Sequence, residues 1–221
     1  SIKDKQLGHF FKASGALAIA AIIGVLTSST SLYANYEFGK ETTRGKPVLT
    51  HNDGNQTKGL DRDYITQWSY GIGETYTLLV PGARGGGSIE PVSKSSASYN
   101  NFHQEKMPLY WGNQPFTSGP VYFGAIIVFL FIFGLLVVKG PERWWILIAT
   151  ILAILLSWGK NLIGLNGWLF EHLPLYNKFR TPSMSLVLAN VLMVLMAVLG
   201  IRETTSKELD VKKTLRALFI S

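Results

Sequence analysis

VYFGAIIVFLFIFGLLVV, residues 121–138, contains no charged side chain and decides the class of fold. Two more apolar stretches follow it, WWILIATILAILLSW at 144–158 and SMSLVLANVLMVLMAVLGI at 183–201. A helix that crosses a bilayer needs about 17–25 mostly apolar residues. We therefore expect membrane-spanning helices at 119–138, 144–158 and 182–201.

A further span is expected at 13–33, although its two halves differ in polarity. ASGALAIAAIIGVL at 13–26 is apolar, whereas the rest reads TSSTSLY. Hydroxyl groups within a bilayer need hydrogen-bond partners from their own helix or from neighbouring protein. We expect this second half to be covered by protein or to line a wet cavity.

The composition favours a membrane protein over a soluble enzyme. Hydrophobic residues make up 47% of the 221 residues and charged residues only 16%, against about 25% charged in soluble domains. Cysteine is absent, which excludes disulfides and thiolate metal sites. The formal net charge is +7, but the basic residues do not form one stripe, so a nucleic-acid role is disfavoured.

The distribution of Lys and Arg predicts the topology, because short cytoplasmic loops of membrane proteins are enriched in both. It favours cytoplasmic N- and C-termini. The predicted order is a cytoplasmic flank at 1–12, a helix at 13–33, an exterior loop or subdomain at 34–118, a helix at 119–138, a cytoplasmic loop at 139–143, a helix at 144–158, an exterior interfacial segment at 159–181, a helix at 182–201 and a cytoplasmic tail at 202–221. The expected fold class is an all-α polytopic membrane protein with about four spans and a mixed, loop-rich exterior subdomain.

The exterior loop 34–118 carries the carboxylates and aromatic rings typical of sugar-binding sites, Trp68 and Glu74 among them. Solvated surface groups remain the alternative for each. Asp61 and Asp63 resemble a weak metal-binding pair, and no metal site is predicted. The glycines in GARGGGS at 82–88 lack the Lys-Ser/Thr of a phosphate-binding loop, so a turn is expected there.

The second exterior segment, 159–181, is expected to form a short helix at the membrane surface. Lys178 and Arg180 then precede Pro182, at the start of the last span. Two cations beside a helix N-terminus favour an anion such as a lipid phosphate. Simple attraction of both side chains to phospholipid headgroups is the other interpretation.

Several motifs resemble the YfhO-type family of bacterial membrane proteins, which is grouped with the GT-C glycosyltransferases. They are ETTRGKPVLT at 41–50, YITQWSYGIGETYTLLVPGARGG at 64–86, YWGNQPFTSGPVYFGA at 110–125, and LSWGKN with LPLYNKFRTPSMSL between 156 and 186. The resemblance covers nearly the whole chain. Members of the family are much longer, so the chain is expected to be an internal portion of such a protein.

The resemblance implies a bacterial inner-membrane enzyme that moves a sugar from a polyprenyl-phosphate donor to an envelope glycan or protein acceptor on the exterior face. Independently of the resemblance, the Asp61 and Asp63 pair gives only weak support for a divalent metal as a cofactor. The catalytic carboxylate of such enzymes lies in an early exterior loop, which has no counterpart here, so the catalytic residue is expected outside this chain. The residues carried over as candidates for substrate binding are Arg44, Trp68, Glu74, Lys178 and Arg180.

Two other functions remain open at the level of sequence. A transporter of lipid or solute would use the hydroxyl-rich half of 13–33 as a pathway wall, but the three most apolar spans carry no ionisable residue at their centres. A non-catalytic partner subunit would hold other proteins through its exterior loop. Membrane lipids are the partners that all these interpretations share.

Overall fold

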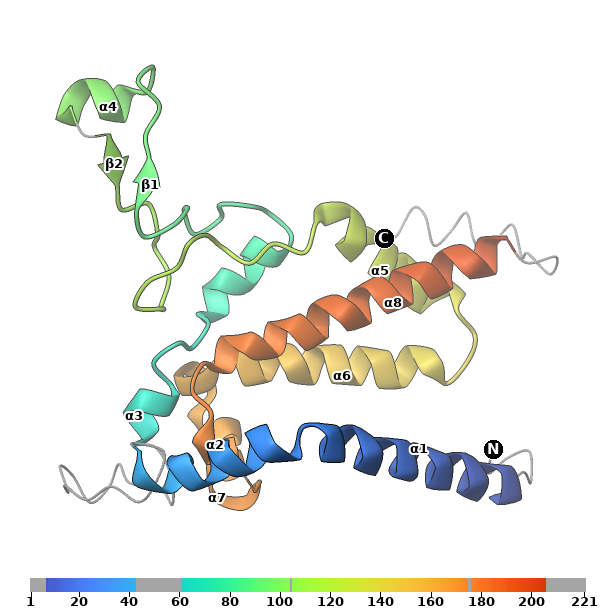
Figure 1. The fold of residues 1–221 in the computed structure, drawn as a ribbon. Helices are drawn as coiled ribbons and strands as arrows, with labels where there is room; N and C mark the ends of the chain where they lie inside the picture. The colour runs from blue at the N-terminus through green and yellow to red at the C-terminus, as the bar shows by residue number, and fades with distance from the viewer. Residues whose placement is uncertain (1–6, 43–60, 104, 175, 206–221) are drawn as a thin grey trace. The chain divides into compact units, whose positions relative to one another are not determined.

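The computed structural model describes residues 7–42, 61–103, 105–174 and 176–205, and these are mostly helical (Figure 1). The chain divides into two compact units, Ser1–Leu60 and Asp61–Ser221.

The first unit contains two consecutive helices, α1 (Leu7–Thr27) and α2 (Ser29–Glu41). They are separated at Ser28, whose φ of −105° and ψ of 9° leave the helical region. The break falls within the hydroxyl-rich TSSTS run, where the Thr27 side chain donates to the Gly24 carbonyl at 2.8 Å. Such side-chain bonds to the backbone weaken a helix interior. Neither helix has a buried side chain.

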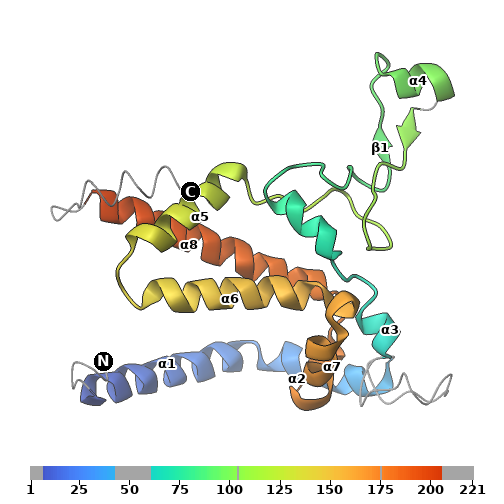
Figure 2. The same ribbon diagram turned by 180° about the vertical axis from the view of Figure 1, so that it is seen from behind.

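The second unit begins with short elements joined by turns. They are α3 (Arg62–Ile65), the 3-10 helix η1 (Ile72–Leu78), β1 (Glu90–Pro91), α4 (Ala97–Phe102) and β2 (Lys106–Met107). β1 and β2 pair antiparallel, and α4 lies at the far end of this arm (Figure 2). The antiparallel contact continues towards Trp111, whose N–H donates to the Arg84 carbonyl at 2.9 Å.

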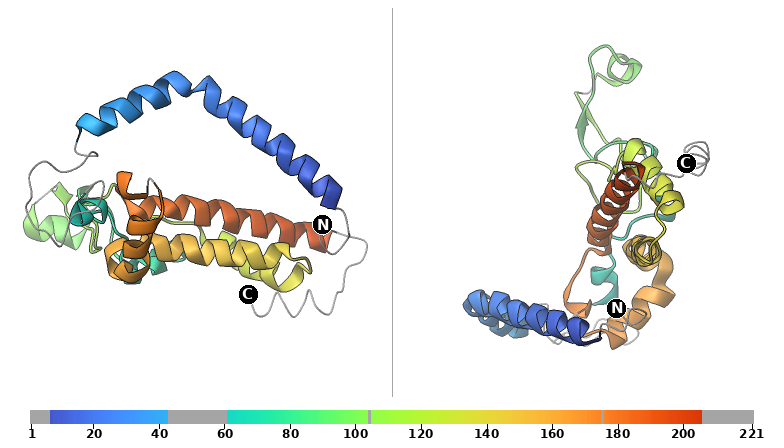
Figure 3. Two further views of the ribbon diagram at one scale, coloured as in Figure 1. Left: turned by 90° about the horizontal axis from the view of Figure 1, so that it is seen from below. Right: turned by 90° about the vertical axis from the view of Figure 1, so that its right-hand side faces the viewer.

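The rest of the second unit is a helical layer. It consists of α5 (Ala125–Val137), α6 (Glu142–Ser157), η2 (Gly159–Leu162), α7 (Ile163–His172), η3 (Tyr176–Lys178), η4 (Pro182–Ser185) and α8 (Leu186–Thr204). α8 packs against both α5 and α6 (Figure 3). Their shared core includes Ile146, Ala189 and Met196, and Tyr70 and Phe123 from the preceding segment join it.

α5 and α8 approach closely where two glycines meet. A Cβ atom on Gly200 would lie 2.7 Å from the Cα of Gly134, and one on Gly134 would lie 2.5 Å from the Met196 carbonyl oxygen. Small residues allow helix backbones to come this near, and dispersion contacts then stabilise the pair.

Two helices are long and apolar enough to cross a membrane, Leu7–Thr27 and Pro182–Thr204. The second agrees with the span expected at 182–201, whereas the first begins before the expected 13–33 and ends at the break before α2. A third span results if the bent pair Glu142–Ser157 and Gly159–His172 is counted as one. The described residues thus support two or three spans.

The span expected at 119–138 is helical only from Ala125, which leaves 13 residues. At about 1.5 Å per residue this covers roughly 20 Å, less than the apolar thickness of a bilayer. Residues 121–124 are not helical, because their backbone is bonded to η1 instead. The Phe123 N–H donates to the Leu78 carbonyl at 3.1 Å, and the Thr77 hydroxyl donates to the Val121 carbonyl at 3.0 Å.

The helix expected at 144–158 is α6, and the chain then bends by 114° into the helix that follows. Gly159 makes the bend with a φ of +45°, a conformation that other residues rarely adopt. A Cβ atom there would also lie 2.0 Å from the Ser69 hydroxyl.

The contact between α5 and α8 predicts a selective effect of adding one methyl group. We expect Gly134→Ala to lower the free energy of unfolding by about 1–3 kcal/mol, because the methyl group has no space against Met196. Gly164→Ala, in α7, is the control, because a Cβ there meets nothing within 4 Å. Thermal unfolding in detergent should show a lower midpoint for Gly134→Ala alone. Equal midpoints for both variants would contradict the packing described.

Candidate functional site, an arginine between two aromatic rings

Residues 64–70, which we call the strap, run across the ends of α6 and α8. The Tyr70 N–H donates to the Ser157 carbonyl at 2.8 Å, at the end of α6. The N–H groups of Thr181 and Ser183 donate to the carbonyls of Ile65 and Trp68, at 3.3 and 3.2 Å. Segments between 87 and 116 residues apart in the sequence are therefore joined through their backbones.

Local hydrogen bonds shape the strap. The Asp61 carboxylate caps α3 by accepting from the Asp63 N–H at 3.0 Å. The Ser69 hydroxyl donates to the Thr66 carbonyl at 2.6 Å and accepts from the Lys160 N–H at 2.8 Å. Ile65, Ser69 and Tyr70 are buried, while Tyr64 is exposed and Trp68 is half-buried.

Arg180 lies over the rings of Tyr64 and Trp68, the two aromatic side chains of the strap that are not fully buried. Its guanidinium carbon is 4.9 Å from the centre of the Trp68 ring and 5.1 Å from that of Tyr64. Its Nη1 donates to the Tyr64 hydroxyl. Cation–π attraction of this kind contributes about 0.5–1 kcal/mol at exposed sites. We call Arg180, Tyr64 and Trp68 the aromatic cage.

The surroundings hold the cage in place and leave the cation available. Phe116 meets the Trp68 ring edge-on at 5.3 Å between centres. Thr181 has a φ of +87°, a strained conformation that reverses the chain directly before Pro182. Among the described residues, no carboxylate forms an ion pair with Arg180. A guanidinium has five N–H donors, so most of those of Arg180 can face a ligand.

An apolar pocket of about 220 Å³ adjoins the cage, with Arg180 among its lining residues. Its walls include the side chains of Ile65, Leu156, Phe170 and Leu188. Pockets that enclose a whole small ligand measure about 300–1,000 Å³. This pocket therefore suits one apolar end of an amphipathic molecule whose anionic group binds Arg180.

Two of the five residues predicted to bind substrate, Trp68 and Arg180, come together in the cage. Lys178 lies two residues before Arg180 in η3, half-buried. Arg44 lies outside the described residues. Tyr64 is not among the predicted substrate-binding residues, because its contact with Arg180 depends on the strap, which no sequence spacing reveals.

Glu74, the fifth candidate, lies in a different and enclosed place. It is 3% exposed. Its Oε2 accepts from the N–H groups of Gly71 and Asn113 at 2.6 and 3.0 Å, and its Oε1 accepts from the Tyr110 hydroxyl at 2.6 Å. Three donors thus surround a carboxylate that joins η1 to the segment before α5.

This carboxylate is the centre of a polar network that reaches the helical layer. The Asn113 amide donates to the Asn161 side chain at 3.2 Å, and Asn161 donates to the Tyr70 carbonyl at 2.9 Å. The Trp158 indole N–H donates to the Thr75 hydroxyl at 3.0 Å. The network runs from the buried Glu74 to the exposed Asn113. Polar groups with hydrogen-bond partners make such a network rigid where it is buried.

Two tyrosines of this region have altered acidity. Burial raises the pKa of Tyr70 to about 12, and nearby Glu74 adds to the increase. Burial also raises the pKa of Tyr110, as does the hydrogen bond that Tyr110 donates to Glu74. Both side chains therefore stay protonated well above neutral pH.

The remaining motifs have structural roles. The GARGGGS stretch is an ordered turn: the Gly86 N–H donates to the Leu109 carbonyl at 2.9 Å, and the Gly87 N–H donates to Glu90 at 2.7 Å. Gly85 has a φ of +80° and lies directly against Leu109. Within the described ranges, no three His, Asp or Glu side chains gather as metal ligands would.

Comparison with known proteins leaves the family open. No protein-family model matches the sequence, and searches of curated proteins and of solved structures give no match.

The enclosure of Glu74 predicts that its charge stabilises the fold. We expect Glu74→Gln to lower the free energy of unfolding by about 1–3 kcal/mol, because the new amide NH₂ cannot accept from the donors around it. Glu105→Gln, at an exposed position of the same unit, is the control and should have little effect. A Glu74→Gln variant with unchanged thermal stability and reduced substrate binding would instead assign Glu74 to the ligand.

Burial of Tyr70 predicts a loss of stability in alkali. Below pH 10 the tyrosine is protonated in both states; between pH 10 and about 12 the unfolded chain loses the proton while the folded protein keeps it. The free energy of unfolding should therefore fall over this range, by an amount on the order of 2 kcal/mol.

Tyr70→Phe removes this titration and should reduce the dependence of the unfolding midpoint on pH, leaving the part that comes from Tyr110. It also removes the hydrogen bond to Thr77. Tyr76→Phe is the control, since Tyr76 is 71% exposed. Identical pH profiles for Tyr70→Phe and the unaltered chain would show that Tyr70 does not cause the loss.

Proposed function

We propose that the chain is the lipid-phosphate-binding part of a GT-C-like membrane glycosyltransferase that moves a sugar from a polyprenyl-phosphate donor to a cell-envelope acceptor. The observation that carries the proposal is Arg180, an exposed cation stacked on Trp68 and Tyr64 at the start of an apolar helix that is long enough to cross a membrane.

The geometry suits an amphipathic anion. The guanidinium can donate two parallel hydrogen bonds to a phosphate, and the adjoining apolar pocket can accept the first part of a hydrocarbon chain. Trp and Tyr are enriched where membrane proteins meet the headgroup region. In sugar transfer, Arg180 would stabilise the negative charge that develops on the departing phosphate.

The proposal includes a membrane topology. It comprises four spans, at 13–33, 119–138, 144–158 and 182–201, with both termini in the cytoplasm of a bacterial cell and the aromatic cage at the exterior surface. The apolar character of α1, α5, α6 and α8 supports it. Local thinning of the bilayer and snorkelling of flanking side chains accommodate a helix as short as α5 at a modest cost.

A non-catalytic partner subunit is the second candidate. It is favoured by the position of Glu74, the predicted substrate-binding carboxylate, which is enclosed by three donors away from Arg180. Such a subunit would present the bound lipid to a catalytic chain.

Substitution of Arg180 tests the proposal in the full protein, reconstituted in proteoliposomes with a labelled polyprenyl-phosphate sugar. We expect Arg180→Ala to reduce transfer about 100-fold, because it removes a charged donor from the phosphate. Arg180→Lys should be intermediate, since lysine keeps the charge but loses the planar stacking and the paired donors. Lys160→Ala is the control, an exposed cation near the same end of α6.

Binding of the sugar-free polyprenyl phosphate, measured in parallel, separates the two candidates. Weakened binding with no transfer by any variant favours the partner subunit. Equal binding and equal transfer by Arg180→Ala and the unaltered protein, at equal protein level, would remove Arg180 from the site.

A further inference from the structure

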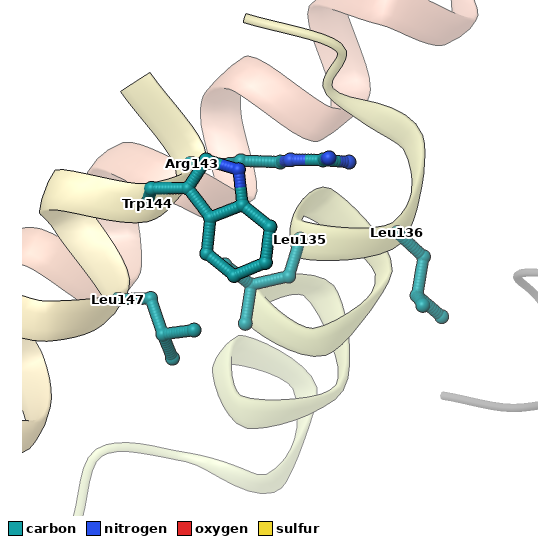
Figure 4. A pocket seen from close by; sticks show the side chains of 5 residues that line it. All are labelled: Leu135, Leu136, Arg143, Trp144 and Leu147. Atoms are coloured by element: carbon teal, nitrogen blue, oxygen red, sulfur yellow. The ribbon is translucent and has the colours of Figure 1, made fainter. Parts of the chain in front are cut away.

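A second cation lies beside an apolar pocket at the other end of α6. The pocket, of about 270 Å³, is formed between the end of α5 and the beginning of α6. Figure 4 shows its lining residues, Leu135, Leu136, Arg143, Trp144 and Leu147. α6 contains 16 residues, so its ends are about 24 Å apart. This pocket is therefore distinct from the one beside Arg180.

Arg143 has few partners for its hydrogen-bond donors. Its guanidinium lies over the Trp144 ring at 4.9 Å, and Nη1 donates a long bond of 3.4 Å to the Val138 carbonyl. Its Nε is buried without a hydrogen-bond partner. Burying an unpaired donor of a cation is unfavourable, and a nearby anion would offset that cost.

Neighbouring carboxylates do not supply this anion. Glu142 precedes Arg143, but its carboxylate is positioned against Gly140, where an added Cβ would lie 1.7 Å from Oε2. Within the described part of the chain, Arg143 forms no ion pair. The positive charge beside the pocket is thus not neutralised by those residues.

The walls of the pocket indicate the rest of the ligand. Leucines from both helices form them, and Trp144 stays 56% exposed. An inorganic anion would use Arg143 and leave the leucines in water, whereas an amphipathic anion uses both. An indole beside a cation at the end of apolar helices is also the arrangement found at membrane surfaces.

We propose that the Arg143–Trp144 pocket binds the headgroup phosphate and upper acyl chain of an anionic phospholipid. If α6 crosses the bilayer, this lipid belongs to the leaflet opposite the aromatic cage. The proposal does not depend on sugar transfer, because it concerns the other end of α6 and residues that the proposed function does not use.

Lipid retention by the purified full protein tests this inference. The protein is reconstituted with equal amounts of phosphatidylglycerol and phosphatidylcholine of the same acyl chains, re-extracted in mild detergent and measured by native mass spectrometry. We expect the unaltered protein to retain phosphatidylglycerol preferentially. Arg143→Ala should reduce that preference about tenfold, the effect of losing one charge-assisted contact.

Arg202→Ala is the matched control. Arg202 is exposed near the end of α8, which lies at the same end of the helical layer as the start of α6 (Figures 1 and 3). Arg202→Ala removes the same charge as Arg143→Ala, but Arg202 does not line the pocket. The lipid preference of this variant should therefore be unchanged. Arg143→Lys separates an effect on the site from an effect on the fold. Lysine keeps the positive charge, so this variant should keep part of the preference for phosphatidylglycerol.

Three results would overturn the proposal. The first is an unchanged lipid preference in Arg143→Ala, and the second is an equal loss of preference in Arg202→Ala. The third is displacement of the retained lipid by millimolar inorganic phosphate, which would indicate a site for free anions. Binding of polyprenyl phosphate by Arg143→Ala, expected to be normal, keeps this test separate from that of the Arg180 site.

Discussion

The backbone hydrogen bonds of the strap are the constraint on which the second unit depends. Ile65, Trp68 and Tyr70 are bonded to the beginning of the last helix and to the end of α6. These bonds fix the positions of the Trp68 and Tyr64 rings, and therefore the contacts that Arg180 makes with both rings. They also bring Ser69 against Gly159, where the absence of a side chain permits the sharp bend after α6. The helical layer and the segment before it therefore form one structure, with Tyr70 and Phe123 in the helical core.

The two ends of α6 use the same chemistry in different surroundings. At each end an arginine lies over a tryptophan ring, Arg143 over Trp144 and Arg180 over Trp68, and an apolar pocket adjoins it. Stacking holds a guanidinium in place while leaving its edge N–H groups for an anion. The difference lies in how the arginine is positioned. Arg143 and Trp144 are consecutive residues of one helix, whereas the Arg180 contacts require the strap and the strained Thr181.

The polar interior between η1 and α6 explains why a segment rich in Gly, Asn and Tyr folds at all. Its apolar side chains are few, and the carboxylate of Glu74 supplies an acceptor for three donors. The close approach of Gly71 and Gly112 to that carboxylate leaves no space for a Cβ atom at either position. Glu74, which its aromatic neighbours in the sequence predict to be a sugar ligand, is thus placed to organise the fold.

The sequence by itself determined that the chain is helical and apolar enough for a membrane, because long runs without charge have few alternatives to burial or lipid. It also predicted the helix that begins at Pro182 and the cation before it. Only the tertiary structure decided that the apolar run from Val121 becomes a helix at Ala125, since Val121 and Phe123 are hydrogen-bonded to η1. The sequence also did not show which residues contact Arg180. Cation–π contacts act over a few ångströms, and residues separated by more than a hundred positions reach that distance only after the backbone between them has folded.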